Sequence, residues 1–179
     1  KDFCTNSAPI EQMRKLRDEN NVDGFDRDTW KSMVELGWAG IPFPEEHGGL
    51  AFGYKGLGVV TEETGRTLTC SPLFASVWVG GPAVNQGGSD AQKAELLSAI
   101  AGGEMLMSLA LEESHRHSPY AISTTASAGG DGYKLNGSKT FVLDGNVADK
   151  LIVVARTSGD TGDRDGLTLF LVDAGAQGV

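Results

Sequence analysis

The chain has 179 residues, 40% of them hydrophobic and 22% charged, a composition typical of a globular protein with one or two domains. Its formal net charge of −9 is not offset by any Lys/Arg block, so its average field would repel a phosphate backbone and argues against nucleic acid as a partner. No apolar run approaches the roughly 20 residues of a membrane span, and the first residues do not resemble a signal peptide. We therefore expect a cytoplasmic protein without a membrane span.

The cysteines and glycines bear on the redox compartment and on the type of architecture. Cys4 and Cys70 lie far apart and match no metal-ligand spacing, so we expect two thiols in a reducing compartment. The 25 glycines follow no fixed period, which argues against a repeat architecture. They stand between periodic segments, where turns and helix caps are expected.

The first clear helix signal follows residue 25. Asp26 or Asp28 is a suitable N-cap, and the apolar residues Trp30, Met33 and Trp38 then fall on one helical face. This spacing predicts an amphipathic helix that continues to Trp38.

A second helix is predicted between a serine cap and a pair of glycines. Ser89 is the expected N-cap, and Gly102 and Gly103 stop the helix. The apolar stripe between them consists of Ala91, Leu96, Leu97 and Ile100. Residues 54–67 and 72–85 are further helix candidates, whereas residues 41–53 hold too much Pro and Gly for regular structure.

The hydrophobic period changes after Met107. Residues 118–145 are rich in Thr, Tyr, Val and Phe and carry Gly-Gly, Asp-Gly and Asn-Gly dipeptides, which are typical of hairpin turns. Residues 150–157 and 166–173 are two more predicted strands. We therefore expect an α+β protein with an all-α helical domain over 1–107 and an antiparallel β-barrel or sandwich domain over 108–179. No Gly-x-Gly-x-x-Gly follows a strand, so a Rossmann dinucleotide site is not expected.

A cluster of charged residues stands at the start of the predicted β domain. His115 and His117 would point the same way from an extended chain, and Glu112 or Glu113 could join them around a metal ion. The Cys or third His of a typical site is missing, so we expect no metal and no acid/base pair here. The open alternatives are an exposed loop and an anion contact in which Arg116 and the histidines replace backbone donors.

Four segments together resemble the acyl-CoA dehydrogenase family. These are LGWAGIPFPEEHGGLAF, VTEETGR, GSDAQKAELLSAIAGGE and GYKLNGSKTFVLDGNVADKLIVVART, in the family's order and at plausible spacing. Each segment alone is a weak match, whereas the set is specific and extends from about residue 25 over most of the chain.

The resemblance implies an N-terminal helical domain, a middle β domain and a C-terminal helical bundle, of which this sequence matches the first two. It also implies FAD-dependent α,β-dehydrogenation of an acyl-CoA thioester, with electron-transfer flavoprotein or a similar acceptor, in a dimer or tetramer of like or unlike chains. In the family the catalytic glutamate belongs to the third domain. We therefore expect no catalytic residue within this chain.

The resemblance further implies a flavin wall built from two segments of the β domain. The family pattern Ala-x-Thr-Glu-Pro-Gly-x-Gly-Ser aligns with residues 110–118, and an aromatic-Ile-Thr triplet aligns with residues 141–143. Ser118 corresponds to a serine on the pyrophosphate and CoA side, so it is also a candidate substrate-binding residue. The candidate cofactor-binding residues are Leu109, Leu111, Glu112, Ser118, Phe141, Val142 and Leu143.

Several of these positions depart from the family pattern. Glu112 replaces the threonine, Leu143 replaces the hydroxyl-bearing residue of the triplet, and residues 114–117 replace Pro-Gly-x-Gly. Ser118 and the aromatic Phe141 are retained. The departures favour two alternatives to a catalytic flavoprotein: a non-catalytic, flavin-poor subunit of a heteromeric acyl-CoA dehydrogenase, and a flavin-free acyl-CoA binding module.

Overall fold

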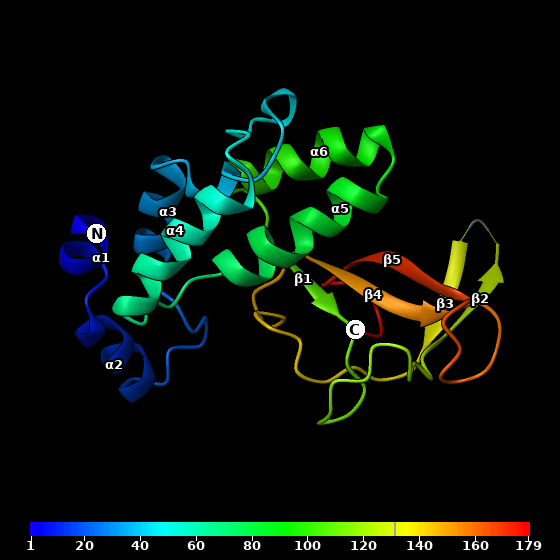
Figure 1. The fold of residues 1–179 in the computed structure, drawn as a ribbon. Helices are drawn as coiled ribbons and strands as arrows, with labels where there is room; N and C mark the ends of the chain where they lie inside the picture. The colour runs from blue at the N-terminus through cyan, green and yellow to red at the C-terminus, as the bar shows by residue number, and fades with distance from the viewer. Residues whose placement is uncertain (131) are drawn as a thin grey trace. The chain divides into compact units, whose positions relative to one another are not determined.

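The computed structural model describes residues 1–130 and 132–179, and these form two compact units. The first unit, Lys1–Leu106, contains all of the described helices, and the second, Met107–Val179, contains all of the described strands (Figure 1). Helices followed by strands were predicted from the change of hydrophobic period, and this order is confirmed. The predicted division fell between residues 107 and 108.

The helical unit consists of short helices joined by tight turns. In chain order they are α1 (Asp2–Ser7), α2 (Ile10–Asp18), α3 (Arg27–Glu35), η1 (Trp38–Gly40), η2 (Glu45–His47), α4 (Gly53–Arg66), η3 (Leu73–Gly80), α5 (Gly81–Gly87) and α6 (Asp90–Ala101).

Helix α3 begins where the sequence predicts and ends earlier. The Asp26 carboxylate accepts a hydrogen bond of 2.7 Å from the backbone N–H of Thr29, so Asp26 is the N-cap. Trp30 and Met33 are buried, as the apolar stripe requires. The predicted continuation to Trp38 is wrong, because Gly37 has a φ of +78° and the chain turns there into η1.

Helix α6 begins at its predicted N-cap, Ser89, which also forms a capping box with Gln92. The Ser89 hydroxyl accepts from the N–H of Gln92 at 3.3 Å, and the Gln92 side chain accepts from the N–H of Ser89 at 2.9 Å. Leu96, Leu97 and Ile100 are buried. Ala91 is exposed, so its assignment to the buried stripe is wrong.

The two other predicted helices are present with altered details. Residues 54–67 correspond to α4, despite the glycines within it. Residues 72–85 correspond to a π-helical turn, η3, followed directly by α5. The two regions are joined by a hydrogen bond of 2.8 Å from the Trp78 ring N–H to the Thr61 hydroxyl.

The second unit is a five-stranded sheet built around its central strand. The strands are β1 (Met107–Ala110), β2 (Thr125–Gly129), β3 (Gly132–Asn136), β4 (Lys150–Arg156) and β5 (Leu167–Asp173). The predicted hairpins are confirmed, because β2 pairs with β3 and β4 pairs with β5 in antiparallel register. Since β5 covers one edge of β4, both β1 and β2 pair with the other edge, and both run parallel to β4.

The expected antiparallel β-barrel or sandwich is confirmed only as a separate β unit, and its purely antiparallel character is wrong. The sheet of the described residues is mixed and open. Residues 111–124 and 137–149 connect the strands as long excursions, and connections of that length allow β1 and β4 to run parallel. Within β4, Ile152 and Val154 are buried on one face, while Leu151 and Val153 face the other.

In the described part of the chain, no helix is long and apolar enough to cross a membrane.

Candidate functional site

Two loops of the second unit meet beside the sheet. We call residues 111–118 the charged loop and residues 137–144 the Phe141 loop. The backbone N–H of Thr140 donates to the carbonyl oxygen of Glu112 at 2.8 Å, which joins the two loops directly. The structure therefore brings together the two segments that the sequence predicts to form one wall, although they lie far apart in the chain.

Glu113 is the centre of this contact. Its carboxylate accepts from the Lys139 ammonium at 2.7 Å, from the N–H of Ser123 at 2.7 Å and from the N–H of Thr124 at 2.9 Å, and the Ser123 hydroxyl also donates to it. The side chains of Glu113 and Lys139 are only 11% and 9% exposed. Lys139 also donates to the carbonyl oxygen of Leu111 at 3.1 Å.

These contacts fix the charge state of Glu113. Burial alone would raise the pKa of the Glu113 carboxyl, but the hydrogen bonds from Lys139, Ser123 and Thr124 outweigh burial and hold the pKa far below its ordinary range. The carboxylate is therefore ionised at neutral pH and fully engaged, so it acts as a clamp between loops and is unsuited to proton transfer.

Glu112 turns in a different direction and folds back on its own loop. Its carboxylate lies 2.5 Å from the Nδ1 atom of His117 and accepts from the N–H of Ser118 at 3.3 Å. The Glu112 side chain is 20% exposed. A second internal turn follows, in which the Ser114 hydroxyl accepts from the N–H of Arg116 at 3.3 Å. The charged loop is thus folded around its own side chains.

The arrangement of the charged loop bears on the metal hypothesis. Glu112 pairs with His117, whereas Glu113 is committed to Lys139, so the carboxylates and histidines do not converge. Among the described residues, no three His, Cys, Asp or Glu side chains come together as a metal site would require. His115 and Arg116 are exposed at the tip of the loop.

The Phe141 loop differs from its prediction. Phe141 was expected on a strand, but residues 137–149, all of them described, form no strand. Phe141 and Asp144 have φ values of +50° and +54°, and the Asp-Gly sequence closes a turn in which the N–H of Gly145 donates to the Val142 carbonyl at 3.1 Å. Phe141 and Leu143 are consequently 68% and 56% exposed.

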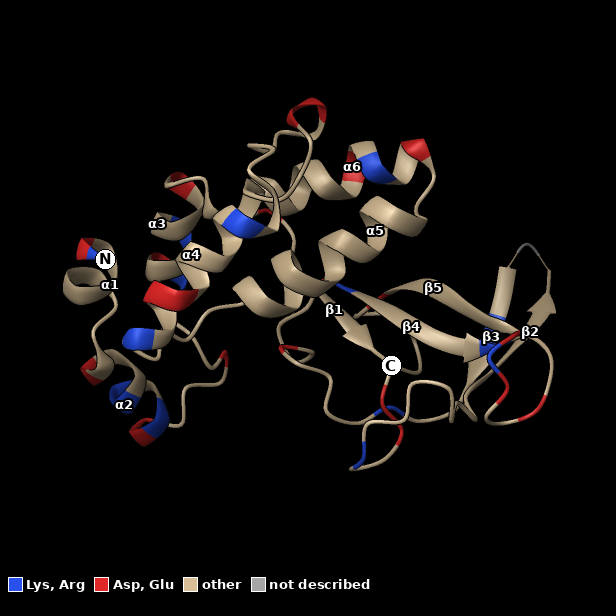
Figure 2. Cartoon of the chain, in the orientation of Figure 1, with Lys and Arg blue, Asp and Glu red and all other residues tan. Residues whose placement is uncertain are grey.

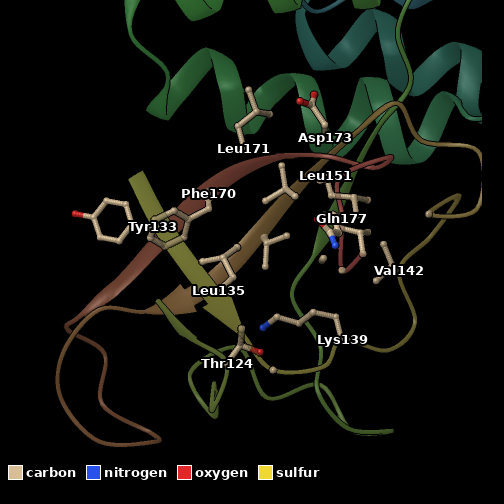
Figure 3. Close-up of a pocket in the computed structure, with 18 of the residues that line it drawn as sticks. Thr124, Tyr133, Leu135, Lys139, Val142, Leu151, Phe170, Leu171, Asp173 and Gln177 are labelled. Atoms are coloured by element: carbon tan, nitrogen blue, oxygen red, sulfur yellow. The ribbon is translucent and has the colours of Figure 1, made fainter. Parts of the chain in front are cut away.

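Beside these loops the sheet forms an apolar groove of about 1210 Å³. Leu135, Leu151, Val153 and Phe170 line its floor, and Figure 3 shows Lys139 at one end of it. Charged residues are sparse on this part of the sheet and gather in the loops around it (Figure 2).

Few of the predicted cofactor-binding residues line this groove. Phe141 and Val142 do, whereas Leu111, Glu112 and Ser118 belong to the charged loop and Leu143 is exposed in the Phe141 loop. The remaining predicted residue, Leu109, alternates along β1 with Ala110, which lines the groove. Leu109 therefore points to the opposite face of the sheet.

Three polar residues of this region were missed by the sequence reasoning. Lys139 is nearly buried, and a buried lysine is almost always paired with a carboxylate, here that of Glu113. Of the three residues, Lys139 is the one that its residue type could have indicated as part of an ion pair. Ser108 donates to the carbonyl oxygen of Leu143 at 2.6 Å, which anchors the Phe141 loop to β1. The hydroxyl of Thr124 is buried at the groove, with no hydrogen-bond partner among the described residues.

Arg156 is a further residue that sequence reasoning missed. It ends the apolar strand β4 and is 6% exposed. Its guanidinium donates to five backbone carbonyl oxygens, at 2.9 to 3.3 Å, from Tyr120, Ile122, Ser158, Asp163 and Asp165. Arg156 thereby connects the segment after the charged loop to the β4–β5 turn.

The polar groups of this wall do not fit the flavin that the resemblance implies. The N–H of Ser118 is already bound to the Glu112 carboxylate, which also adds a negative charge where a flavin diphosphate would approach. At the second segment, Val142 and Leu143 offer apolar side chains in place of a hydroxyl. Only Phe141, an exposed aromatic ring, suits contact with a flavin.

Comparison with known proteins identifies relatives over almost the whole chain. Residues 1–104 match the family model described as acyl-CoA dehydrogenase, N-terminal domain, and residues 108–179 match the acyl-CoA dehydrogenase, middle domain. A 3-(aryl)acrylate reductase of Clostridium sporogenes is 32% identical over 174 residues, which are 94% of this chain and 46% of that protein. The chain thus spans about half the length of the curated relatives it matches.

Solved structures agree with the family models. A variant of the Tcur3481-Tcur3483 steroid ACAD matches with a TM-score of 0.83 and 32% identity, over 97% of this chain and 45% of that one. The ChsE4-ChsE5 complex of Mycobacterium tuberculosis matches with a TM-score of 0.76 and 27% identity, over 94% of this chain and 45% of that one. The chain belongs to the acyl-CoA dehydrogenase family, of which it comprises the N-terminal and middle domains.

Proposed function

We propose that the protein containing this chain takes part in the FAD-dependent α,β-dehydrogenation of an acyl-CoA thioester. The observation that carries the proposal is the match of both family models in sequence, over residues 1–104 and 108–179. The meeting of the charged loop with the Phe141 loop supports it, because these are the two segments that the family uses for its flavin wall.

In this reaction the chain contributes to binding the acyl-CoA thioester and to shielding the reacting groups from water. The apolar groove and the exposed ring of Phe141 offer surface from which water is excluded once another part of the protein covers them. Ser118, half-buried in the charged loop, has a hydroxyl suited to the polar CoA side of a thioester. The base that removes the α proton belongs, in this proposal, to residues outside this chain.

The names of the relatives point to several classes of acyl group as possible substrates. One relative is named for an aryl-substituted acrylate and one solved structure for a steroid. Bulky, ring-bearing acyl groups therefore belong in the substrate panel beside straight and branched chains. As electron acceptor we propose electron-transfer flavoprotein or a similar carrier, and as quaternary state a dimer or tetramer in the cytoplasm.

A second candidate function is a non-catalytic subunit of a heteromeric acyl-CoA dehydrogenase. The contact that favours it is the one between Glu112 and the N–H of Ser118, which engages a donor that a flavin would use. The names of two similar solved structures, Tcur3481-Tcur3483 and ChsE4-ChsE5, each join two components.

The test is oxidation of acyl-CoA thioesters by the full-length protein, expressed alone and together with a second family chain of the same organism. FAD and an artificial electron acceptor are supplied, and the product is analysed by mass spectrometry. The proposal predicts acceptor reduction and a product lighter by two hydrogens with at least one acyl-CoA. A flavin-loaded preparation that oxidises no member of a panel of straight, branched, aryl and steroid acyl-CoA thioesters contradicts it.

A further inference from the structure

We propose that Glu112 occupies the N–H of Ser118 and the ring of His117 in its own loop, so that this chain holds no flavin diphosphate there and depends on a partner chain of the same family for the flavin. The inference rests on the proposed function and assigns a role to this chain within it. It concerns the charged loop and the neighbouring Phe141 loop and does not depend on which acyl group is oxidised.

The first step is that two N–H donors of the charged loop, and two of the segment after it, already have acceptors within the chain. The N–H of Ser118 donates to Glu112, and the N–H of Arg116 donates to the Ser114 hydroxyl. The N–H groups of Ser123 and Thr124 donate to Glu113. An incoming diphosphate would have to displace side chains that belong to the chain itself, and their effective concentration is high because they are attached to the same loop.

The second step is electrostatic. The Glu112 carboxylate is 20% exposed, and its partner His117 is 74% exposed at the loop surface. A flavin diphosphate placed against Ser118 would therefore face a carboxylate that is largely withdrawn from water. Juxtaposed like charges in such a setting oppose binding.

The third step is that the neighbouring loop supplies no compensating polar contact. Val142 and Leu143 are apolar, and the Leu143 carbonyl oxygen accepts from Ser108. The exposed ring of Phe141 can contact a flavin supplied by another chain, because an aromatic face needs no donor. The chain thus retains a surface for a flavin ring, while the charged loop has no free Ser118 N–H for the flavin diphosphate.

The occupant that completes this site is a second acyl-CoA dehydrogenase chain that has the threonine and glycines missing here. Two solved structures with TM-scores of 0.83 and 0.76 carry two-component names, so assemblies of this kind have the right overall fold. In such an assembly the partner supplies the diphosphate loop, and this chain supplies apolar surface.

The experiment measures FAD binding by the full-length protein expressed alone. Flavin content is read from the absorbance spectrum, and affinity from the quenching of FAD fluorescence on titration. Wild-type protein is expected to be colourless after gel filtration. Glu112→Thr removes the carboxylate and restores a small hydroxyl, and a double variant with His117→Gly also removes the other half of the contact. At least one of the two is expected to bind FAD about tenfold more tightly than wild type or better.

Two controls keep the result specific. Glu35→Gln removes an exposed carboxylate from the end of α3 in the helical unit, so it changes net charge equally without touching the charged loop. It should leave FAD binding unchanged. Glu112→Asp keeps the charge on a shorter side chain, and it should not gain FAD binding if the carboxylate itself repels the diphosphate.

Stoichiometric FAD on the wild-type protein expressed alone overturns the inference, as does failure of both Glu112 variants to gain affinity. Neither outcome touches the proposed function, because a homo-oligomer that binds FAD and oxidises acyl-CoA satisfies that function. Conversely, an assembly that holds FAD and oxidises no acyl-CoA defeats the proposed function while leaving the FAD titrations of this chain valid.

Discussion

At the residue scale, the adjacent carboxylates Glu112 and Glu113 have different roles because they point to different partners. Glu113 is held by a buried ammonium ion and backbone N–H groups, whereas the Glu112 carboxylate contacts the His117 ring within its own loop. The family pattern separates the two positions, since only Glu112 departs from it, but the sequence does not show which partner each carboxylate contacts. Their division of roles therefore follows from the fold, which brings Lys139 to one of them only.

The ion pair of Glu113 and Lys139 is expected to be strongly coupled. Glu113→Gln or Lys139→Met alone leaves one buried group without its charged partner, which costs about 3–5 kcal/mol of unfolding free energy. The double variant removes both charges and should recover a clear part of that loss. Urea unfolding of the four proteins measures the coupling. Additive effects of the two substitutions would show that the pair is not coupled.

The lowered pKa of Glu113 predicts how stability depends on pH. The folded protein keeps this carboxylate ionised below the ordinary pKa of 4.5, whereas the unfolded chain takes up a proton there. The stabilisation by Glu113 is therefore complete above pH 4.5 and decreases as the pH falls below that value toward the folded pKa. Glu113→Gln should flatten the acid limb of the unfolding free energy. An acid limb of unchanged slope in urea titrations would contradict this assignment.

Arg156 is expected to be irreplaceable by lysine. One ammonium cannot reach the five carbonyl oxygens that the guanidinium binds, so Arg156→Lys leaves buried acceptors unsatisfied. We expect a loss of about 2–4 kcal/mol of unfolding free energy. Arg116→Lys, at an exposed position, is the matched control and should change stability by about 0.5 kcal/mol or less. Equal effects of the two substitutions would rule out an anchoring role for Arg156.

At the element scale, prediction from the sequence succeeded where the signal is local. The N-cap of α6 and the two hairpins follow from residues close together in the chain, such as Ser89 and Gln92 or the Gly-rich turn between β2 and β3. The parallel pairing of β1 with β4 could not be predicted, because no local pattern records which distant strand lies alongside. The Phe141 loop was mistaken for a strand because its residue types favour β structure, while the Asp-Gly turn that overrides them is a weaker signal.

The same limits apply to the site. The two segments of the wall were predicted by resemblance, and the fold brings them together. The contacts of Glu112, Lys139 and Arg156 were not predicted, since side-chain direction depends on the tertiary structure. The sequence thus indicated which two segments meet, without revealing that the Glu112 carboxylate binds within its own loop.

The N-cap of α6 provides a test at this scale. Ser89→Ala removes the hydroxyl that accepts from Gln92 and should lower the unfolding free energy by about 1 kcal/mol. Ser89→Asp, which can cap equally well, should keep stability near that of wild type. Thermal or urea unfolding distinguishes the two variants. A loss of equal size in both would mean that the cap contributes nothing specific.

At the scale of the whole molecule, the two units correspond to the two family domains. The helical unit contains the N-terminal domain match, and the sheet with its two loops contains the middle domain match. In our proposal the catalytic base and the donors for the flavin diphosphate come from residues outside this chain. Activity is therefore expected from an assembly in which other residues and a partner chain complete the site.

The measurement that tests this account most directly is the flavin spectrum of the full-length protein, purified alone and purified with a second acyl-CoA dehydrogenase chain of its organism. The account predicts a colourless protein in the first case, and in the second a yellow complex whose flavin absorbance is bleached by an acyl-CoA thioester. A yellow protein in the absence of the partner, with one flavin per chain, would contradict the closed loop at Glu112. A yellow complex that no acyl-CoA bleaches would contradict the proposed dehydrogenation.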